Sequence, residues 1–151
     1  MPVIDKFTVV PQQSYAVAFS VDSLHINAFQ RSARKADALE FLEKLGNHFD
    51  ETEGCYTHED GTVVHEESFF VECHSAECVH KIAEFAGLWE QESILTVNQN
   101  GIAYLVFADK SLDAVRLGRF CEITQDEVGE YENYSILREG KNTRFFTVKE
   151  S

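Results

Sequence analysis

The stretch ESILTVNQNGIAYLVF, residues 92–107, carries the strongest fold signal in the sequence. It holds two apolar runs rich in β-branched and aromatic residues, 92–97 and 102–107, on either side of the turn Asn98-Gln-Asn-Gly101. Such runs favour extended backbone, and a short turn containing Asn and Gly between them is typical of a β-hairpin. This stretch therefore predicts an antiparallel sheet.

Similar patterns on both sides of this hairpin predict further strands. Apolar residues alternate with polar ones or form short runs, and clusters of turn residues separate them. Two of the turns, at Glu59-Asp-Gly61 and at Glu139-Gly-Lys-Asn142, are expected to close hairpins of their own. The additional strands are expected at residues 14–20, 49–56, 67–73, 119–124, 134–138 and 143–148.

Two segments have the apolar spacing of amphipathic helices. One covers residues 32–45 and is followed by Gly46, the residue type that most often ends a helix in the left-handed conformation. The other begins at Ser75, a favourable N-cap, and closes at Gly87. A short helical turn that carries Leu112 and Val115 is expected after Asp109.

The order of these elements predicts the fold class. Two helices and several hairpins suggest an α+β protein in which the helices pack on one face of an antiparallel sheet. The β-α-β-β-α-β order at the front hints at a ferredoxin-like core with a β-rich C-terminal extension, although the strand order is left open. With no Pro-, Gly- or Ser-rich linker, residues 1–151 are expected to form a single domain.

Composition narrows the function classes. The chain has 151 residues and a formal net charge of −13, so its surface repels phosphates and anionic lipid headgroups. Direct binding to nucleic acid or to a membrane is therefore not expected. There is no apolar run of roughly 20 residues and no secretory signature. The four cysteines are expected to be free thiols in a cytoplasmic protein, in the host cytoplasm if a phage encodes it.

Acidic residues are concentrated in one segment of the chain. Between Leu45 and His80 there are nine acids and neither lysine nor arginine. Carboxylates spaced along a hairpin can imitate a row of phosphates and occupy the groove of a nucleic-acid enzyme, although a solvated face without function is the simpler explanation. The candidate partner-binding face consists of Asp50, Glu51, Glu53, Glu59, Asp60 and Glu66.

Cysteine and histidine gather in the same segment. Zn²⁺ takes four such ligands, and a Cys-x-x-His pair can supply two of them from one turn. A candidate zinc set is therefore Cys55, His58, Cys73 and Cys78. We favour the interpretation without a metal, because one member of the return pair ends a strand and the other lies inside a helix. Cys78 is the best candidate for a catalytic thiol, but its acidic surroundings raise a thiol pKa.

Motifs for the commonest enzyme chemistries are missing from the sequence. It has no phosphate-binding Gly-Lys-Ser/Thr loop, Gly-x-Gly-x-x-Gly turn, His-Glu-x-x-His helix or Gly-x-Ser-x-Gly elbow. Adjacent acids such as Glu66 and Glu67 cannot be chosen as a catalytic pair, because neighbours on a strand point to opposite faces. No cofactor is expected.

An ordered set of short motifs runs from Arg31 to Phe107. They are Arg31-Ser32, Leu42-x-x-Leu45-Gly46, Gly54-Cys55-Tyr56, Glu66-Glu-Ser-Phe-Phe-Val71 and Gln91-Glu-Ser-Ile-Leu95. By these motifs the chain resembles a family of small bacterial and bacteriophage proteins catalogued only as a domain of unknown function. The resemblance spans about half of the chain and implies an α+β fold, with no catalytic residue to transfer. Its shared polar residues are Glu67, Ser68, Gln91, Glu92 and Ser93, for which packing at strand edges is the alternative role.

Two functional hypotheses follow. The first is a non-enzymatic acidic binding protein, encoded by a phage or mobile element, that binds and modulates a host protein such as a nucleic-acid-binding enzyme. The second is a domain or sponge that binds a small molecule or nucleotide through an arginine-lined pocket. The arginines expected to supply the anion contacts are Arg116, Arg119, Arg138 and Arg144.

Overall fold

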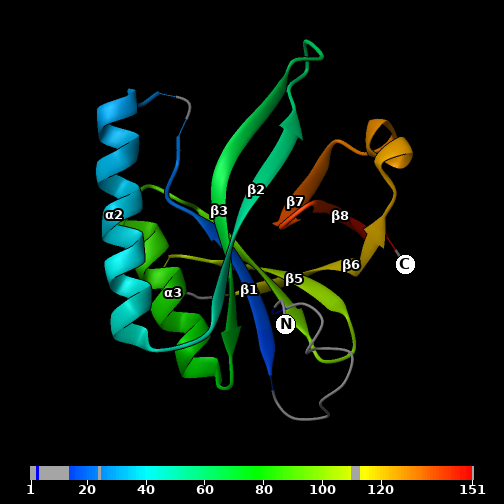
Figure 1. The fold of residues 1–151 in the computed structure, drawn as a ribbon. Helices are drawn as coiled ribbons and strands as arrows, with labels where there is room; N and C mark the ends of the chain where they lie inside the picture. Colours follow the sequence, from blue (N-terminus) through cyan, green and yellow to red (C-terminus); the bar gives the residue numbers. More distant parts are fainter. Residues whose placement is uncertain (1–2, 4–13, 24, 110–112, 151) are drawn as a thin grey trace.

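The sheet of this protein closes on itself, and two helices pack against its outside (Figure 1). The structure is a computed structural model that describes residue 3 and residues 14–23, 25–109 and 113–150. In this part of the chain the elements are β1 (Tyr15–Ser20), α2 (Ala28–Leu45), β2 (Phe49–Thr57), β3 (Val63–Cys73), α3 (Ala76–Leu88), β4 (Ser93–Asn98), β5 (Ile102–Phe107), β6 (Ala114–Ile123), the 3-10 helix η1 (Gln125–Glu130), β7 (Asn133–Glu139) and β8 (Asn142–Lys149).

All strand pairs of the barrel are antiparallel. Among the described residues the strand order is β1-β3-β2-β7-β8-β6-β5-β4, and β4 returns to pair with β1. The hairpins expected from the sequence are confirmed as β2–β3, β4–β5 and β7–β8. Strands from distant parts of the chain complete the ring, since β7 pairs with β2 and β8 pairs with β6.

The expected α+β arrangement with a ferredoxin-like core is wrong. The segment interpreted as a C-terminal extension supplies three barrel strands, and residues 133–136 pair directly with residues 53–56. An alternating strand pattern shows which side chains share a face but carries no information about a partner eighty residues away. Closure through these non-local pairs removes the open edges that a two-layer sheet would have left.

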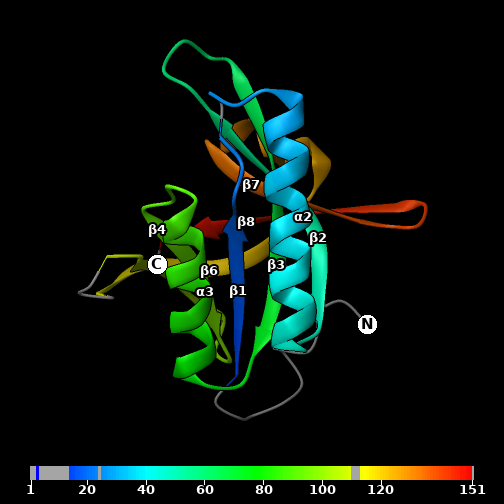
Figure 2. The same ribbon diagram turned by 90° about the vertical axis from the view of Figure 1, so that its left-hand side faces the viewer.

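Alternation along each strand creates two separate cores. On β1, Val17 and Phe19 point outward and join the buried cluster that includes Leu42 of α2 and Ile82 of α3. Ala16, which precedes Val17 on the same strand, points inward and belongs to a smaller cluster inside the barrel. Figure 2 shows α2 and α3 in front of β1 and β3, where they cover this outward-facing core.

Both helices begin at side-chain caps. Asn27 and Gln30 form a reciprocal capping box, which starts α2 four residues earlier than the apolar spacing indicated. Its end at Gly46 is confirmed, with φ of 78°. The predicted N-cap Ser75 of α3 is also confirmed, but this helix continues past Gly87 to Leu88. Neither helix in the described part of the chain combines the length and apolar character needed to cross a membrane.

Aromatic rings fill one end of the barrel interior and leave the other end open. Phe120 and Phe146 stack with their centroids 5.5 Å apart, and Phe70 meets Phe120 edge-on at 5.9 Å. The small side chains of Ala16 and Ala18 on β1 lie against this group. The rings fill the lumen between these strands. Toward the end of β1 and the start of β4, the surrounding residues enclose an open space.

Barrel closure at β6 depends on a glycine. Gly118 has φ of 148°, and a Cβ added there would lie 2.1 Å from the carbonyl oxygen of Lys149 on β8. The same position marks a register shift between β5 and β6. The helical turn expected after Asp109 falls mainly on residues 110–112, which lie outside the described residues, and Val115 belongs to β6.

Candidate functional site

A cavity of about 810 Å³ opens at the end of the barrel where β1 ends and β4 begins. We call it the lumen cavity. Its volume falls within the range of roughly 300–1,000 Å³ that is typical of ligand pockets. The floor is apolar and includes Leu95, Leu117 and Phe120, whereas the wall carries hydroxyl, amide and carboxylate groups. Such a mixture favours an amphiphilic small molecule.

The wall of the lumen cavity is acidic. Four carboxylates line it, and among its described residues there is no lysine, arginine or histidine. Three tyrosines, Tyr56, Tyr131 and Tyr134, add aromatic faces that attract cations, and Nζ of Lys149 already lies 5.9 Å from the ring centroid of Tyr131. The cavity is therefore suited to a ligand that carries positive charge beside a flat ring. The four carboxylates are Glu66, Glu130, Glu132 and Glu150.

Strand register places the central carboxylate of this wall. Glu66 on β3 lies opposite Gly54 on β2, so the two residues face the same side of the sheet. Tyr56, two residues after Gly54, faces the same side, and its hydroxyl donates a hydrogen bond to Oε1 of Glu66 at 3.4 Å. The Glu66 carboxylate and the Tyr56 hydroxyl thus converge in the lumen cavity.

Gly54 leaves the space in front of Glu66 empty. A Cβ added at this glycine would lie 3.9 Å from both its nearest neighbours, the backbone oxygen of Glu66 and Oγ of Ser68. No close backbone approach therefore requires a glycine here. The absence of a side chain instead opens the cavity next to the carboxylate.

The environment of Glu66 disfavours its charged form. Burial and the nearby negative charge of Asp22 raise the pKa of Glu66, while the hydrogen bond from Tyr56 and the charge of Arg31 act in the opposite direction. A cationic ligand in the lumen cavity would relieve this penalty. Glu66 is thus a carboxylate for which a positively charged ligand is a favourable partner.

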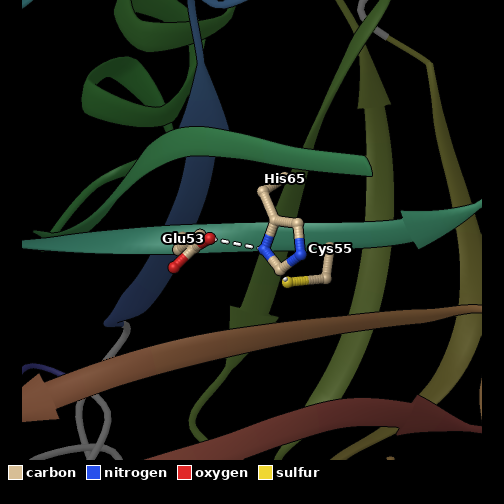
Figure 3. A group of neighbouring side chains, drawn as sticks. All are labelled: Glu53, Cys55 and His65. Atoms are coloured by element: carbon tan, nitrogen blue, oxygen red, sulfur yellow. Dashed lines mark hydrogen bonds and ion pairs between the residues drawn. The ribbon is translucent and has the colours of Figure 1, made fainter. Parts of the chain in front are cut away.

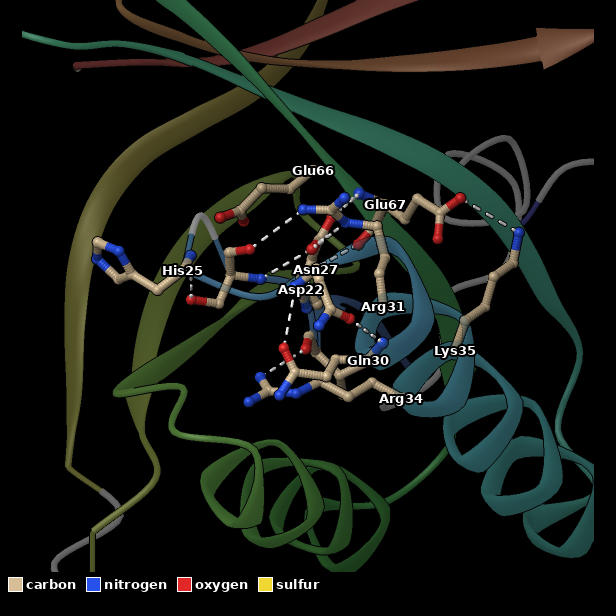
Figure 4. A network of polar contacts seen from close by, with 12 residues as sticks. Asp22, His25, Asn27, Gln30, Arg31, Arg34, Lys35, Glu66 and Glu67 are labelled. Carbon is tan, nitrogen blue, oxygen red and sulfur yellow. Dashed lines mark hydrogen bonds and ion pairs between the residues drawn. The ribbon is translucent and has the colours of Figure 1, made fainter.

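Asp22 anchors the wall behind Glu66 (Figure 4). Its carboxylate is buried and accepts hydrogen bonds from Nε of Arg31 at 2.7 Å and from the backbone N–H of Ser23 at 2.8 Å. The other oxygen accepts the backbone N–H of Glu67 at 3.1 Å. Asp22 therefore fixes β3 at the residue that follows Glu66, and its own charge is already paired.

Further hydrogen bonds hold the loop that carries Asp22. Gln91 donates through Nε2 to the backbone oxygen of Asp22 at 2.9 Å. From α2, Nη1 of Arg34 donates to the backbone oxygens of Val21 at 3.1 Å and Trp89 at 3.4 Å. The loop after β1, the start of α2 and the segment before β4 are thereby joined into one support.

A second cluster of reactive side chains lies on the outer face of the same hairpin (Figure 3). The ligand atoms of Glu53, Cys55 and His65 all lie within 4.8 Å of one another. Sγ of Cys55 is 3.3 Å from Nδ1 of His65, which also contacts Oε1 of Glu53. Among the residues that the structure describes, this is the group able to hold a metal ion.

Comparison with known proteins identifies the family. A family model described as the S-adenosylmethionine lyase family matches residues 17–148, which run from within β1 to within β8. The chain belongs to this family. No curated protein matches it. The matched range contains both helices and the whole β2–β3 hairpin, so it includes Gly54, Tyr56 and Glu66.

Membership in the lyase family corrects two expectations from the sequence. The motifs between Arg31 and Phe107 fall inside the matched range, but the family is a named one and not a domain of unknown function. The hypothesis of a non-enzymatic phage protein that inhibits a host partner is contradicted, because the family is described as one of lyases. That hypothesis was based on the absence of common catalytic motifs, and such an absence does not exclude an enzyme.

The six acids of the expected partner-binding face do not share one surface. Glu66 lines the lumen cavity, and Glu51 and Glu53 point outward, where Nζ of Lys35 and Nη1 of Arg138 pair with them at 3.1 and 2.6 Å. Asp50 accepts the backbone N–H of Val3. The remaining two, Glu59 and Asp60, are exposed at the tip of the β2–β3 hairpin. A protein partner for this chain stays a prediction.

The four arginines expected to line an anion pocket also remain apart from the lumen cavity. They lie on β6, β7 and β8, and none belongs to the described lining of the cavity. Arg119 donates to the backbone oxygen of Asn100, and Arg144 pairs with both Glu122 and Glu139. Their positions support the barrel strands and the β7–β8 hairpin.

The four residues of the predicted zinc set are not brought together. Cys55 lies opposite His65 near one end of β3, whereas Cys73 ends the strand eight residues later. At 3.3 Å per residue this separation is about 26 Å. Cys73 instead contacts Cys78 through a hydrogen bond that raises the pKa of Cys73 and lowers that of Cys78. No single ion can contact both halves of the set.

Sequence reasoning located part of the cavity wall. Of the five polar residues that the resemblance suggested, Ser68, Gln91 and Ser93 line the lumen cavity. Gly54 and Tyr56 belong to the Gly54-Cys55-Tyr56 motif, for which the sequence predicted no role. The signal that could have found them is the Gly-x-Tyr alternation facing Glu66 across a hairpin, which needs the register of β2 and β3.

Proposed function

We propose that this protein cleaves S-adenosylmethionine as a lyase and that the lumen cavity is its active site. The observation that carries the proposal is the cavity lining, which combines four carboxylates and three tyrosines without a basic side chain among its described residues. Membership in the S-adenosylmethionine lyase family supplies the reaction class. The proposal therefore rests on the chemistry of the cavity wall as well as on the family.

The parts of S-adenosylmethionine match the surfaces of the cavity. Its sulfonium and α-ammonium groups are cations, for which carboxylates and tyrosine faces are favourable surroundings. Its adenine ring can stack on a tyrosine, and its ribose hydroxyls and adenine nitrogens can form hydrogen bonds with the hydroxyls of Ser68 and Ser93 and with Gln91. The described lining includes no basic side chain, and the nearby ammonium of Lys149 lies against Tyr131, so repulsion of the sulfonium is limited.

The lyase reaction breaks a carbon–sulfur bond of the sulfonium without adding water. If the bond to the methionine γ-carbon breaks, its electron pair stays on sulfur and neutral 5′-methylthioadenosine leaves. The four-carbon fragment is completed either by bond formation from its own carboxylate to the γ-carbon, which gives a lactone, or by loss of a β-proton, which gives an alkene. Both routes conserve atoms and charge and need no oxidant or metal.

Glu66 and Tyr56 are the residues that we assign to this chemistry. The Glu66 carboxylate is positioned to hold the cationic part of the substrate, and its raised pKa also suits it to accept a proton. The Tyr56 hydroxyl orients that carboxylate through the hydrogen bond at 3.4 Å. Positioning of the flexible methionine chain against the sulfonium would then accelerate its cleavage.

We also propose that the enzyme acts in the cytoplasm. All four cysteines are free, and three of them are buried. Free thiols persist in a reducing compartment, which supports this assignment.

Incubation of the purified chain with S-adenosylmethionine tests the proposal. Chromatography should show 5′-methylthioadenosine appearing in a one-to-one ratio with substrate loss. The lactone and the alkene are isomers of equal mass, so proton NMR of the other product separates them, because only the alkene has vinyl protons. Glu66→Gln is the matched control, since it removes the charge and keeps the shape. Intact substrate after prolonged incubation with folded protein, or equal turnover by the Glu66→Gln variant, would contradict the proposal.

A further inference from the structure

The register of the β2–β3 hairpin builds a three-sided cluster on the outer face. Cys55 and His65 are direct cross-strand partners, and Glu53 lies two residues before Cys55 on the same face. Figure 3 shows all three side chains meeting above the strands. The hairpin therefore holds three potential ligands from two adjacent, hydrogen-bonded strands, which form a rigid support.

The donor atoms define the kind of metal that fits. Thiolate sulfur, imidazole nitrogen and carboxylate oxygen together form a ligand set that Zn²⁺ accepts, whereas Mg²⁺ and Ca²⁺ require oxygen ligands alone. Three protein ligands leave one position of a tetrahedral ion open. The set therefore matches zinc with a water or other small ligand in the fourth position.

The spacing of the donor atoms is close to that of a tetrahedral site. Bond lengths of roughly 2.0–2.3 Å imply donor–donor separations of about 3.3–3.6 Å around zinc. Sγ of Cys55 already lies 3.3 Å from Nδ1 of His65. Oε1 of Glu53 is hydrogen-bonded to the same nitrogen and must move outward by less than about 1 Å, which a side-chain rotation provides.

Neighbouring groups orient the three ligands. Nη1 of Arg138 holds Oε2 of Glu53 at 2.6 Å, so that Oε1 is the oxygen directed toward His65. The hydroxyl of Tyr134 hydrogen-bonds the Cys55 thiol. Such outer contacts on carboxylate and thiolate are typical of metal sites. Cys55 is 3% exposed and His65 is 52% exposed, so an ion can enter from the His65 side and reach the buried thiol.

We propose that Glu53, Cys55 and His65 form a zinc-binding site on the outer face of the barrel. The site goes beyond the lyase reaction. Glu53 and His65 lie on the opposite face of the hairpin from Glu66, and Cys55 also borders the lumen cavity. When zinc binds, the thiol proton of Cys55 passes to solvent, and Nδ1 of a neutral His65 ring binds the ion while Nε2 carries the ring proton. The ion then clamps β2 to β3 at the level where the same strands form the wall of the lumen cavity.

Titration of the full-length, metal-free protein with Co²⁺ tests the site. We expect one equivalent of cobalt to produce the near-ultraviolet charge-transfer absorption of a thiolate ligand, and Zn²⁺ to remove it. Cys55→Ser should abolish the absorption, and His65→Gln should weaken cobalt binding by at least about 10-fold. Because His65 is exposed, the His65→Gln variant will fold even if Cys55→Ser does not.

Two matched controls separate this site from other thiols and histidines. Cys121→Ser and His58→Gln remove residues of the same type outside the cluster and should leave the cobalt titration unchanged. No absorption from the wild type with excess cobalt would overturn the proposal. Loss of the absorption in Cys78→Ser together with its persistence in Cys55→Ser would also overturn it. The readout is independent of S-adenosylmethionine cleavage, so failure of either proposal leaves the other intact.

Discussion

The two faces of the β2–β3 hairpin carry the same kinds of side chain in opposite circumstances. Glu66 and Glu67 are consecutive, yet Glu66 points into the lumen cavity and Glu67 points outward. On the outer face Lys35 pairs with Glu67 at 3.5 Å, and Arg138 pairs with Glu53 at 2.6 Å. On the lumen face, Glu66 has a tyrosine hydroxyl as its partner and burial raises its pKa.

This difference separates a carboxylate that already has a cation from one that needs a cation. Hydrogen bonds from Arg138 and His65 lower the pKa of Glu53, even though burial acts in the opposite direction. Its charge is stabilised by the protein itself. Glu66 has no such ion pair in direct contact among the described side chains, so a bound cation is its natural complement. Only the lumen face is therefore prepared for a positively charged substrate.

Substitution of the two neighbouring acids gives the largest expected contrast. Glu66→Gln should lower the rate of S-adenosylmethionine cleavage by about 10²–10⁴-fold, the range for loss of a positioned acid–base or charge-stabilising group. Glu67→Gln should change the rate by less than about 3-fold, because it removes only an exposed ion pair. Measurement of kcat and kcat/KM for both variants shows whether the two substitutions differ in their effect. Equal losses would show that the two faces do not differ in function.

Filling the space beside Glu66 should have the next largest effect. Gly54→Leu places a side chain in the lumen cavity, where the nearest atoms to a Cβ are 3.9 Å away, so the barrel can accept it. We expect affinity for 5′-methylthioadenosine, measured by calorimetry, to fall by at least about 10-fold, or 1.4 kcal/mol. Gly129→Leu, in the open 3-10 helix, is the control. Unchanged affinity of Gly54→Leu would place the ligand elsewhere.

Removal of the hydroxyl that orients Glu66 should lower the catalytic efficiency by a smaller factor than the two substitutions above. Tyr56→Phe keeps the ring on the cavity wall and deletes the hydrogen bond to Oε1 of Glu66. At 3.4 Å this bond is long, so a loss of about 1 kcal/mol, or about 5-fold in kcat/KM, is expected. The pH at which the rate is half-maximal should rise, because the hydrogen bond lowers the pKa of Glu66. A pH profile identical to that of the wild type would exclude this positioning role.

Local signals in the sequence predicted most of the elements but not their assembly. The NQNG turn, Gly46 and the Ser75 cap each act within a few residues, and the structure confirms all three. Barrel closure depends on pairs such as residues 53–56 with 133–136, which no local pattern encodes. The alternating sequence pattern of a strand is the same whether its apolar face packs against helices or points into a barrel lumen.

The candidate site was obscured for the same reason. Alternation shows that Glu66 and Glu67 face opposite sides, but it does not show which side is the lumen. The acids therefore formed one apparent stripe in the sequence and two unrelated environments in the barrel. Gly54 carries no chemistry of its own, and its importance emerges only when Glu66 lies opposite it.

The smallest expected effect concerns the stability of the ligand-free fold. Since folding raises the pKa of Glu66 above its value of 4.5 in the absence of perturbation, the folded state binds more protons between the two values. Stability from this group therefore falls as the pH rises through that window and stays lower above it. Glu66→Gln removes the penalty, so its Tm should exceed that of the wild type by about 1–2 °C near neutral pH.

The pH dependence of this difference is the decisive observation, because other groups cancel between the two proteins. At about pH 4, where Glu66 is largely neutral in both states, the Tm difference should shrink toward zero. Glu67→Gln should show no such gain, since it loses its contact with Lys35. If Glu66→Gln proves less stable than the wild type near neutral pH, a protein cation already stabilises the Glu66 carboxylate. The contrast between the two faces would then lose its electrostatic basis.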